Sequence, residues 1–181
     1  MSITTPDHDI PDHDIPGHDA PDHDTSGQLR PEDFRFARRA WIAATPARLY
    51  DLVSDVSMIG TWSPSASDVS YDDGAGPRAG AWFSGRNRRG GREWTTRAQV
   101  LRAEPGEEFA FVVDGLVRWR WTFRPLGTGA VAEQSWQLLG LDPVLGTTRA
   151  DLDALSAHMA DSVETTLVSL GRWVAESTGN R

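Results

Sequence analysis

The C-terminal part of the chain carries its longest regular pattern of apolar residues. Apolar side chains recur there at spacings of three and four, at Leu152, Leu155, Met159, Val163, Leu167, Leu170 and Val174. This spacing places them in one stripe on a helix with 3.6 residues per turn. Thr148 can cap the N-terminus with Asp151 three residues further on, and Gly179 can stop the helix. The pattern predicts an amphipathic helix over 148–177, one face of which another element covers.

Before this helix, polar and apolar residues alternate with a period of two, which is typical of strands with one buried face. The clearest case is 117–124, where Val117, Trp119, Trp121 and Phe123 alternate with arginine and threonine. Further strands are predicted over 34–43, 68–71, 81–88, 93–101, 108–113 and 130–138. Because most of these segments follow one another with short turns between them, they indicate an antiparallel sheet with a dry face and a polar face.

The sequence of the strand over 130–138 does not show which of its residues point to the interior. Val131 and Trp136 have opposite parity, so a regular strand would point them to opposite faces. A β-bulge between them would bring both to the same face, so the facing of this strand stays open. If Val131 sets the parity, Glu133 faces the interior; otherwise Glu133 is an exposed carboxylate on the outer face.

Two short helices are predicted after the first strand. Thr45 can cap the first helix with Pro46 at its first position, and Leu49, Leu52 and Val53 give it an apolar edge. The element order predicts an α+β fold, in which a curved antiparallel sheet of about six to seven strands wraps around the long C-terminal helix.

Several segments in this order carry a family resemblance. They are 44–53 (ATPARLYDLV), 62–64 (WSP), 80–87 (GAWFSGRN), 94–96 (WTT), 125–128 (PLGT) and the helix over 148–177. Together they resemble the polyketide cyclase/dehydrase branch of the START-like (SRPBCC, Bet v 1-like) superfamily, over about residues 34–175. The resemblance implies a helix-grip fold with a deep, mostly apolar cavity that binds lipids, hormones, polyketides or similar molecules. It implies no fixed catalytic residues, because these differ between members.

Charge and composition exclude some classes of partner and indicate the cellular compartment. The net charge is −8, but residues 1–25 carry seven aspartates and no arginine, and the remainder has 19 acidic against 18 basic residues. Because nucleic-acid-binding domains usually show a positive excess, nucleic acid is not an expected partner. The chain has no cysteine, no apolar run long enough to span a membrane and no signal-peptide pattern. We therefore expect a cytoplasmic protein, whose oligomeric state the sequence leaves open.

The N-terminus repeats a five-residue unit that starts at Pro6, Pro11, Pro16 and Pro21. A proline at every fifth position forbids a helix, and few apolar groups are available to bury. We expect a disordered tail over 1–28, followed by one START-like domain over 29–181. The histidines of the repeat, each beside aspartate, could offer ligands to zinc, nickel or copper, or the repeat is simply solvated; no metal site is assigned.

Apolar and aromatic side chains on the predicted inner faces are candidates for a cavity wall. The candidates are Trp62, Phe83, Trp94, Phe111, Trp119, Trp121, Met159 and Val163, with Asn87 as the polar group that orients a ligand. Flat aromatic side chains around a hollow space suit flat hydrophobic ligands. The first hypothesis is therefore binding of a hydrophobic small molecule, lipid-like or polyketide-like.

The second hypothesis is an enzyme that uses the same cavity, a cyclase or dehydratase of polyketide-like substrates. Glu133 and His158 would then be the catalytic candidates, because a carboxylate and an imidazole can both move protons. Residues 127–132 match the loose dinucleotide pattern G-x-G-x-x-A. A strand is predicted after this match where a phosphate-binding loop needs a helix, so no cofactor is expected.

The predicted domain boundary can be tested by truncation. Deleting residues 1–28 should shift the midpoint of thermal unfolding by no more than about 2 °C, because the repeat offers little to bury. Scanning calorimetry of the full-length and truncated chains measures the shift. A large drop would mean that the tail packs against the domain.

Overall fold

The computed structural model describes residues 28–89 and 91–179. Nearly all of the predicted tail lies outside these residues. The elements in chain order are η1 (Pro31–Asp33), β1 (Arg35–Ile42), α1 (Pro46–Ser54), η2 (Val56–Met58), α2 (Ile59–Trp62), β2 (Ala66–Tyr71), η3 (Asp72–Gly74), β3 (Trp82–Arg89), β4 (Arg92–Glu104), β5 (Glu108–Val113), β6 (Val117–Leu126), β7 (Gly129–Leu138) and α3 (Arg149–Gly179).

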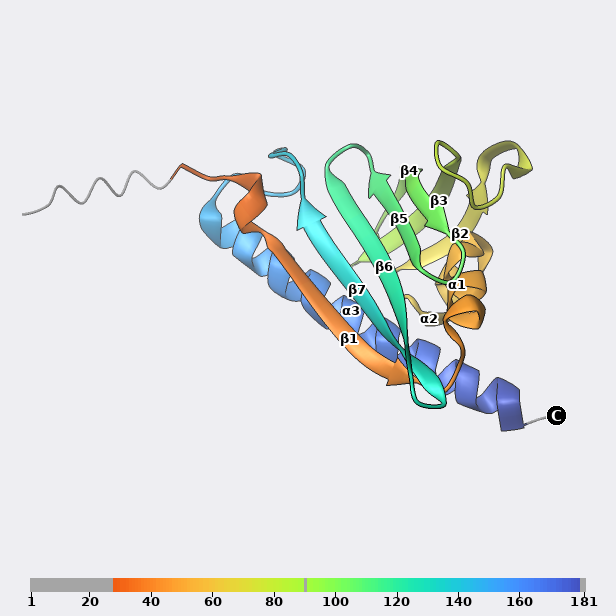
Figure 1. The fold of residues 1–181 in the computed structure, drawn as a ribbon. Coiled ribbons are helices and arrows are strands. Elements are labelled where there is room, and N and C mark those ends of the chain that lie inside the picture. The colour runs from red at the N-terminus through yellow and green to blue at the C-terminus, as the bar shows by residue number, and fades with distance from the viewer. Residues whose placement is uncertain (1–27, 90, 180–181) are drawn as a thin grey trace, which may run out of the picture.

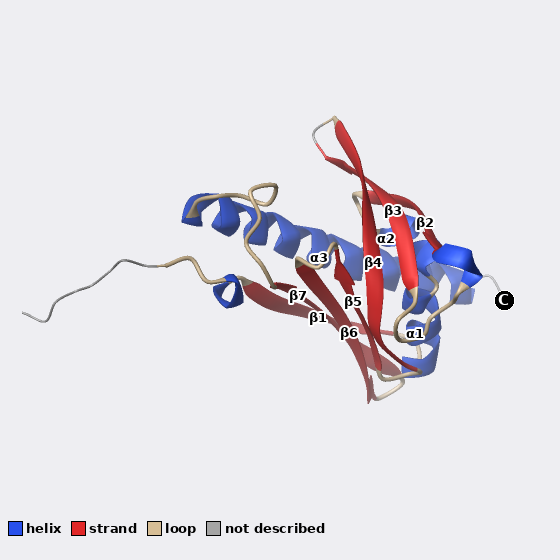
Figure 2. Ribbon diagram, turned by 90° about the horizontal axis from the view of Figure 1, so that it is seen from above, coloured by secondary structure: helices blue, strands red, loops and turns tan. Residues whose placement is uncertain are grey.

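The seven strands form one antiparallel sheet in the order β1-β7-β6-β5-β4-β3-β2. The first strand therefore joins the last, and the rest is a meander. Helix α3 lies along the concave side of this sheet (Figure 1). In the view from above, β3 and β4 cross the direction of β1 and β7, which shows how strongly the sheet curves around α3 (Figure 2). The predicted α+β helix-grip fold is confirmed.

The N-termini of α1 and α3 form as their sequences predict, whereas α3 runs through Gly179, the residue that the sequence predicts to lie just past its end. Thr148 Oγ1 accepts a hydrogen bond from the Asp151 backbone N–H at 3.1 Å, and Asp151 Oδ2 accepts from the Thr148 N–H at 2.9 Å, which together make a capping box. At α1, Thr45 Oγ1 accepts from the Arg48 N–H, and Pro46 is the first helical residue. These side chains satisfy backbone donors that the first turn of a helix leaves without partners.

Strand β7 is regular and has no bulge between Val131 and Trp136. It pairs without interruption with β1 on one side and with β6 on the other. Trp136 points to the interior, where it is 1% exposed, while Val131 and Glu133 point to the outer face. An apolar Val131 is stable there because its cross-strand partner is Trp41, an indole on the outer face.

The hydrophobic core fills one end of the space between sheet and helix. Leu167, Leu170 and Val174 of α3 are buried there, in the same cluster as Phe109 and Phe123 of the sheet. A second cluster, around Phe34, Trp136, Leu138 and Leu152, lies at the other end of α3. The middle of the helix is therefore less tightly covered than its two ends.

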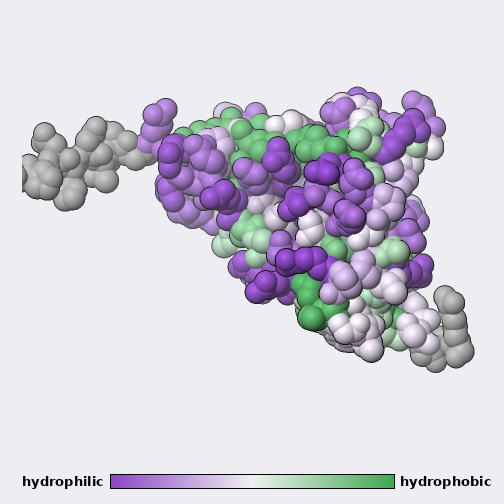
Figure 3. Space-filling model, in the orientation of Figure 1, coloured by the Kyte–Doolittle hydropathy of each residue, from purple (hydrophilic) through white to green (hydrophobic). Residues whose placement is uncertain are grey.

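Apolar side chains also reach the surface. Figure 3 shows them gathered along the upper edge of the molecule, near the β5–β6 turn and the loop after β7. In this loop Leu141 is 45% exposed and Val144 is 69% exposed. This edge borders the cavity that the next subsection describes.

Candidate functional site

A cavity of about 1110 Å³ lies between the inner face of the sheet and α3. Its wall takes residues from β2 to β7, from α1 and α2, from α3 and from the loop before α3. Cavities that bind small molecules commonly measure about 300–1,000 Å³. The space is therefore large enough for a drug-sized ligand.

The wall is rich in aromatic side chains. Its aromatic residues are Trp62, Phe83, Trp94, Phe111, Trp119, Trp121 and Trp136. The sheet register explains part of this, because Phe111 of β5, Trp119 of β6 and Trp136 of β7 are direct cross-strand neighbours. Contacts between rings hold the wall in place. The rings of Phe83 and Phe111 meet edge to face, with their centroids 5.1 Å apart.

The structure places all nine predicted ligand-binding residues around this cavity. They are Trp62, Phe83, Asn87, Trp94, Phe111, Trp119, Trp121, Met159 and Val163. All nine lie on an inner face of the sheet or on the cavity side of a helix, and Trp94, the cross-strand partner of Asn87, lies nearest the β3–β4 hairpin, where it is 39% exposed. That they contact a ligand stays a prediction.

The cavity has a closed inner end and an open outer end. On β6 the wall includes Trp119 and Trp121 but not Phe123, the next inward-facing residue, which is 4% exposed in the solid core. At the other end the wall reaches Asp114 and Val144, both exposed. The cavity therefore opens past the β5–β6 turn and the loop after β7, and also toward the β3–β4 hairpin, where the wall residues Arg92 and Trp94 are exposed.

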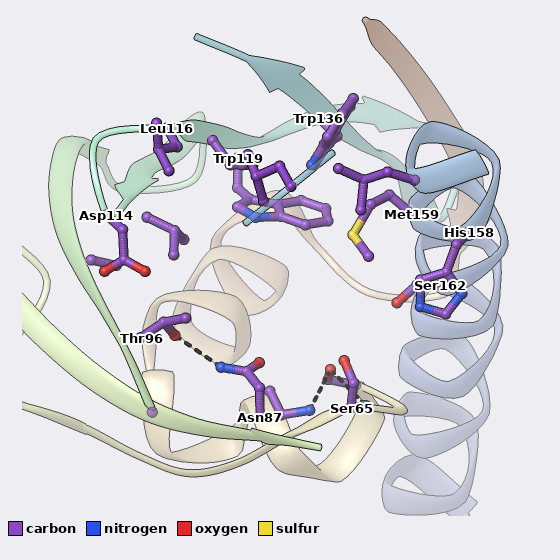
Figure 4. Close-up of a pocket in the computed structure, with 18 of the residues that line it drawn as sticks. Ser65, Asn87, Thr96, Asp114, Leu116, Trp119, Trp136, His158, Met159 and Ser162 are labelled. Atoms are coloured by element: carbon purple, nitrogen blue, oxygen red, sulfur yellow. Dashed lines mark hydrogen bonds between the residues drawn. The ribbon is translucent and has the colours of Figure 1, made fainter. Parts of the chain in front are cut away.

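Polar side chains also line the cavity, in several separate places. Asn87 Nδ2 donates a hydrogen bond to Thr96 Oγ1 at 2.9 Å, which fixes the amide of Asn87 on the sheet side of the cavity. His158 and Ser162 lie across from it on α3 (Figure 4). Asp151 is at the rim, where hydrogen bonds from Thr148 lower the pKa of its carboxyl. Asp151 therefore stays ionised and belongs to the helix cap.

The two catalytic candidates end in different places. His158 lies in the cavity wall and is half-buried. Glu133 lies on the outer face of β7, between Arg39 of β1 and Thr122 of β6. The interpretation in which Glu133 faces the interior is wrong, because Trp136 and not Val131 sets the parity of this strand. Glu133 is not positioned to exchange protons with a molecule in the cavity.

Gln134 is a wall residue that the sequence interpretation missed. It is 7% exposed, lines the cavity, and its Oε1 has no hydrogen-bond partner among the described residues. Buried side-chain oxygens are rarely left unpaired. The parity of Trp136, two residues further along the same strand, was the signal that could have identified it.

Two further features bear on what the chain can bind. Among residues 28–89 and 91–179, no helix is long and apolar enough to cross a membrane. The same residues hold no group of three or more histidine, aspartate or glutamate side chains that could bind a metal ion. The histidines of the N-terminal repeat lie outside this part of the chain.

A family model described as polyketide cyclase / dehydrase and lipid transport matches residues 33–172. The chain belongs to this family. A member of known structure, the Polyketide_cyc-like protein Cgl2372 from Corynebacterium glutamicum, is 30% identical, and the match covers 82% of this chain and 95% of that protein with a TM-score of 0.61. No curated protein matches the sequence.

More distant structures share the fold of this family member. The di-domain ARO/CYC StfQ from the steffimycin biosynthetic pathway is 17% identical with a TM-score of 0.66, and the match covers 81% of this chain and 52% of StfQ. Ara h 8.0201 is 11% identical with a TM-score of 0.59, over 78% of this chain and 97% of that protein. At these identities the likeness concerns the fold alone.

A pair of substitutions tests whether the space inside the wall is hollow. Phe109→Ala should lower the free energy of unfolding by about 3–5 kcal/mol, because Phe109 is fully buried in the solid core. Trp119→Ala should cost about half as much, since one side of its indole borders the cavity and loses no packing there. Urea unfolding of both variants measures the difference. Equal losses would mean that the indole is packed on all sides.

Proposed function

We propose that this protein binds a flat, hydrophobic small molecule, lipid-like or polyketide-like, in the cavity between the sheet and α3. The observation that carries the proposal is the aromatic wall around a cavity of about 1110 Å³. Burial of apolar ligand surface supplies the main driving force, and aromatic faces favour flat ring systems. The family description, which names both polyketide chemistry and lipid transport, supports both ligand types.

Affinity follows from the shape of the site. A pocket that covers most of a drug-sized ligand commonly reaches a micromolar Kd, which corresponds to about −8 kcal/mol. The apolar wall supplies little directional bonding, so polar groups such as Asn87 would set the orientation of the ligand. The exposed apolar residue Val144 at the open end would bury further apolar surface of the ligand, which favours binding.

A second candidate is cyclisation or dehydration of a polyketide-like substrate in the same cavity. The observation that favours it is the half-buried His158 in the wall, since imidazole exchanges protons near neutral pH. The fold shared with StfQ, which is described as an ARO/CYC, agrees with this candidate. The aromatic wall would fold the chain of the substrate, and Asn87 would polarise one of its carbonyl groups.

Filling the cavity from the helix side tests the binding proposal. Met159→Trp should abolish binding of 1-anilinonaphthalene-8-sulfonate, because the larger side chain takes up space that the probe needs. The fold should survive, since a hollow accepts added volume without the strain that overpacking causes. Probe fluorescence measures binding, and thermal unfolding checks the fold.

Val168→Trp is the matched control for this test. Val168 lies on the same helix, is 60% exposed and is not part of the cavity wall, so its replacement should leave probe affinity unchanged. The binding proposal is refuted if the unmutated protein takes up no probe, or if Met159→Trp binds it as well as Val168→Trp does.

The two candidate functions are separated by His158→Gln. Binding alone predicts that this variant keeps its probe affinity and that neither form converts a polyketone thioester. Catalysis predicts slow conversion by the unmutated protein and a loss of about 10²-fold or more in the variant at unchanged probe affinity. Product formation by liquid chromatography and mass spectrometry measures the rates.

A further inference from the structure

The inner face of the sheet carries two neighbouring rows of cross-strand residues. The first row, which is further from the core, is aromatic throughout. It consists of Phe111, Trp119, Trp136 and Phe36, which follow one another across β5, β6, β7 and β1. The next row, one step closer to the core, is Phe109, Trp121, Gln134 and Arg38. In this second row the aromatic series stops at Gln134, which puts a neutral amide where the first row has Trp136.

The amide oxygen of Gln134 is buried without a partner. The residue is 7% exposed, and Oε1 accepts no hydrogen bond from any described residue. Its cross-strand neighbour Arg38 is engaged elsewhere, since Arg38 Nε donates to Glu164 Oε1 at 2.7 Å and Nη1 donates to the Ala37 carbonyl. An unpaired buried acceptor destabilises the folded chain. Such a group persists at functional sites, where a ligand can supply the missing donor.

Gln134 lies at the inner end of the cavity. On β7 the wall includes Trp136 and Gln134, whereas Ala132, the next inward-facing residue, is fully buried and outside the wall. On α3 the wall ends at a similar depth with Thr166, which is 6% exposed. The distance from the outer wall residue Val117 to Trp121, the cross-strand neighbour of Gln134, is about 13 Å at the usual rise of a strand.

We propose that Gln134 Oε1 accepts a hydrogen bond from a hydroxyl group at the inner end of the bound molecule. The ligand class is then a flat apolar ring system up to about 13 Å long that carries a hydroxyl group at the end that enters first. The aromatic row of Phe111, Trp119 and Trp136 covers its rings, and the apolar residues of the open end cover its tail. Gln134 is thus the specificity-determining residue of the site, an inference that rests on the proposed binding function.

A pair of probes that differ in one donor tests this inference. 2-Naphthol and 2-methoxynaphthalene share the same ring system and the same oxygen position, but only the naphthol can donate a hydrogen bond. Isothermal titration calorimetry on the full chain should give a Kd for 2-naphthol about tenfold lower than for 2-methoxynaphthalene, because a buried acceptor is satisfied by one probe only.

Gln134→Met removes the acceptor and keeps the length of the side chain. In this variant the two probes should bind with Kd values within about twofold of each other, chiefly because 2-naphthol loses its partner. The matched control is Gln137→Met, on the outer face of the same strand, where the tenfold preference should remain. Gln134→Leu repeats the test with a differently shaped apolar side chain.

Thermal unfolding gives an independent readout. Without ligand, Gln134→Met and Gln134→Leu should raise the Tm by about 2–4 °C, because an unsatisfied buried acceptor is removed. A lower Tm in both variants would show that the amide stabilises the fold, and this would overturn the inference.

The outcomes separate this inference from the proposed function. If neither probe binds the unmutated protein and 1-anilinonaphthalene-8-sulfonate also fails, the proposed function is wrong. If both naphthalenes bind the unmutated protein equally well, or if the preference survives in Gln134→Met, the binding function stands and the role of Gln134 is overturned.

Discussion

The structure depends on how α3 covers the dry face of a sheet that curves around it. Toward its C-terminal end the helix buries Leu167, Leu170 and Val174 against the sheet, and toward its N-terminal end Leu152 packs with Phe34. Between these two contacts α3 still meets β1, where Arg38 pairs with Glu164, but the cavity lies between the helix and strands β3 to β7. The sheet curves more strongly than a helix of this length bends, so contact at both ends leaves a hollow in the middle. The cavity is therefore a consequence of the same packing that holds the fold together.

This hollow places opposing demands on its wall. Large aromatic side chains line it without filling it, so part of their surface gives up the packing that a solid core would provide. Gln134 adds a buried oxygen without a partner. Both features lower the stability of the ligand-free chain, and both are explained if a flat hydroxylated molecule occupies the space. The wall residues that lower the stability of the ligand-free chain are then the same residues that select the ligand.

The same geometry bears on the choice between binding and catalysis. General acid–base chemistry needs a group that can exchange protons within reach of the substrate. Glu133 lies on the other side of the sheet, and the wall carboxylates Asp114 and Asp151 both accept backbone hydrogen bonds, which makes His158 the candidate in the wall that the structure supports best.

Local sequence determined most of the elements. Period-two alternation located β5 at its observed bounds, Glu108–Val113, and the Thr45–Pro46 and Thr148–Asp151 pairs located two helix starts, because these signals act between residues close in the chain. Tertiary structure alone decided the facing of β7. Its parity depends on pairing with β1, almost a hundred residues earlier, where Trp41 covers Val131 on the outer face. Alternate residues of a strand point to opposite faces, so the local sequence does not say which set faces the interior. The pairing with neighbouring strands decided that Gln134 faces the cavity and Glu133 faces outward.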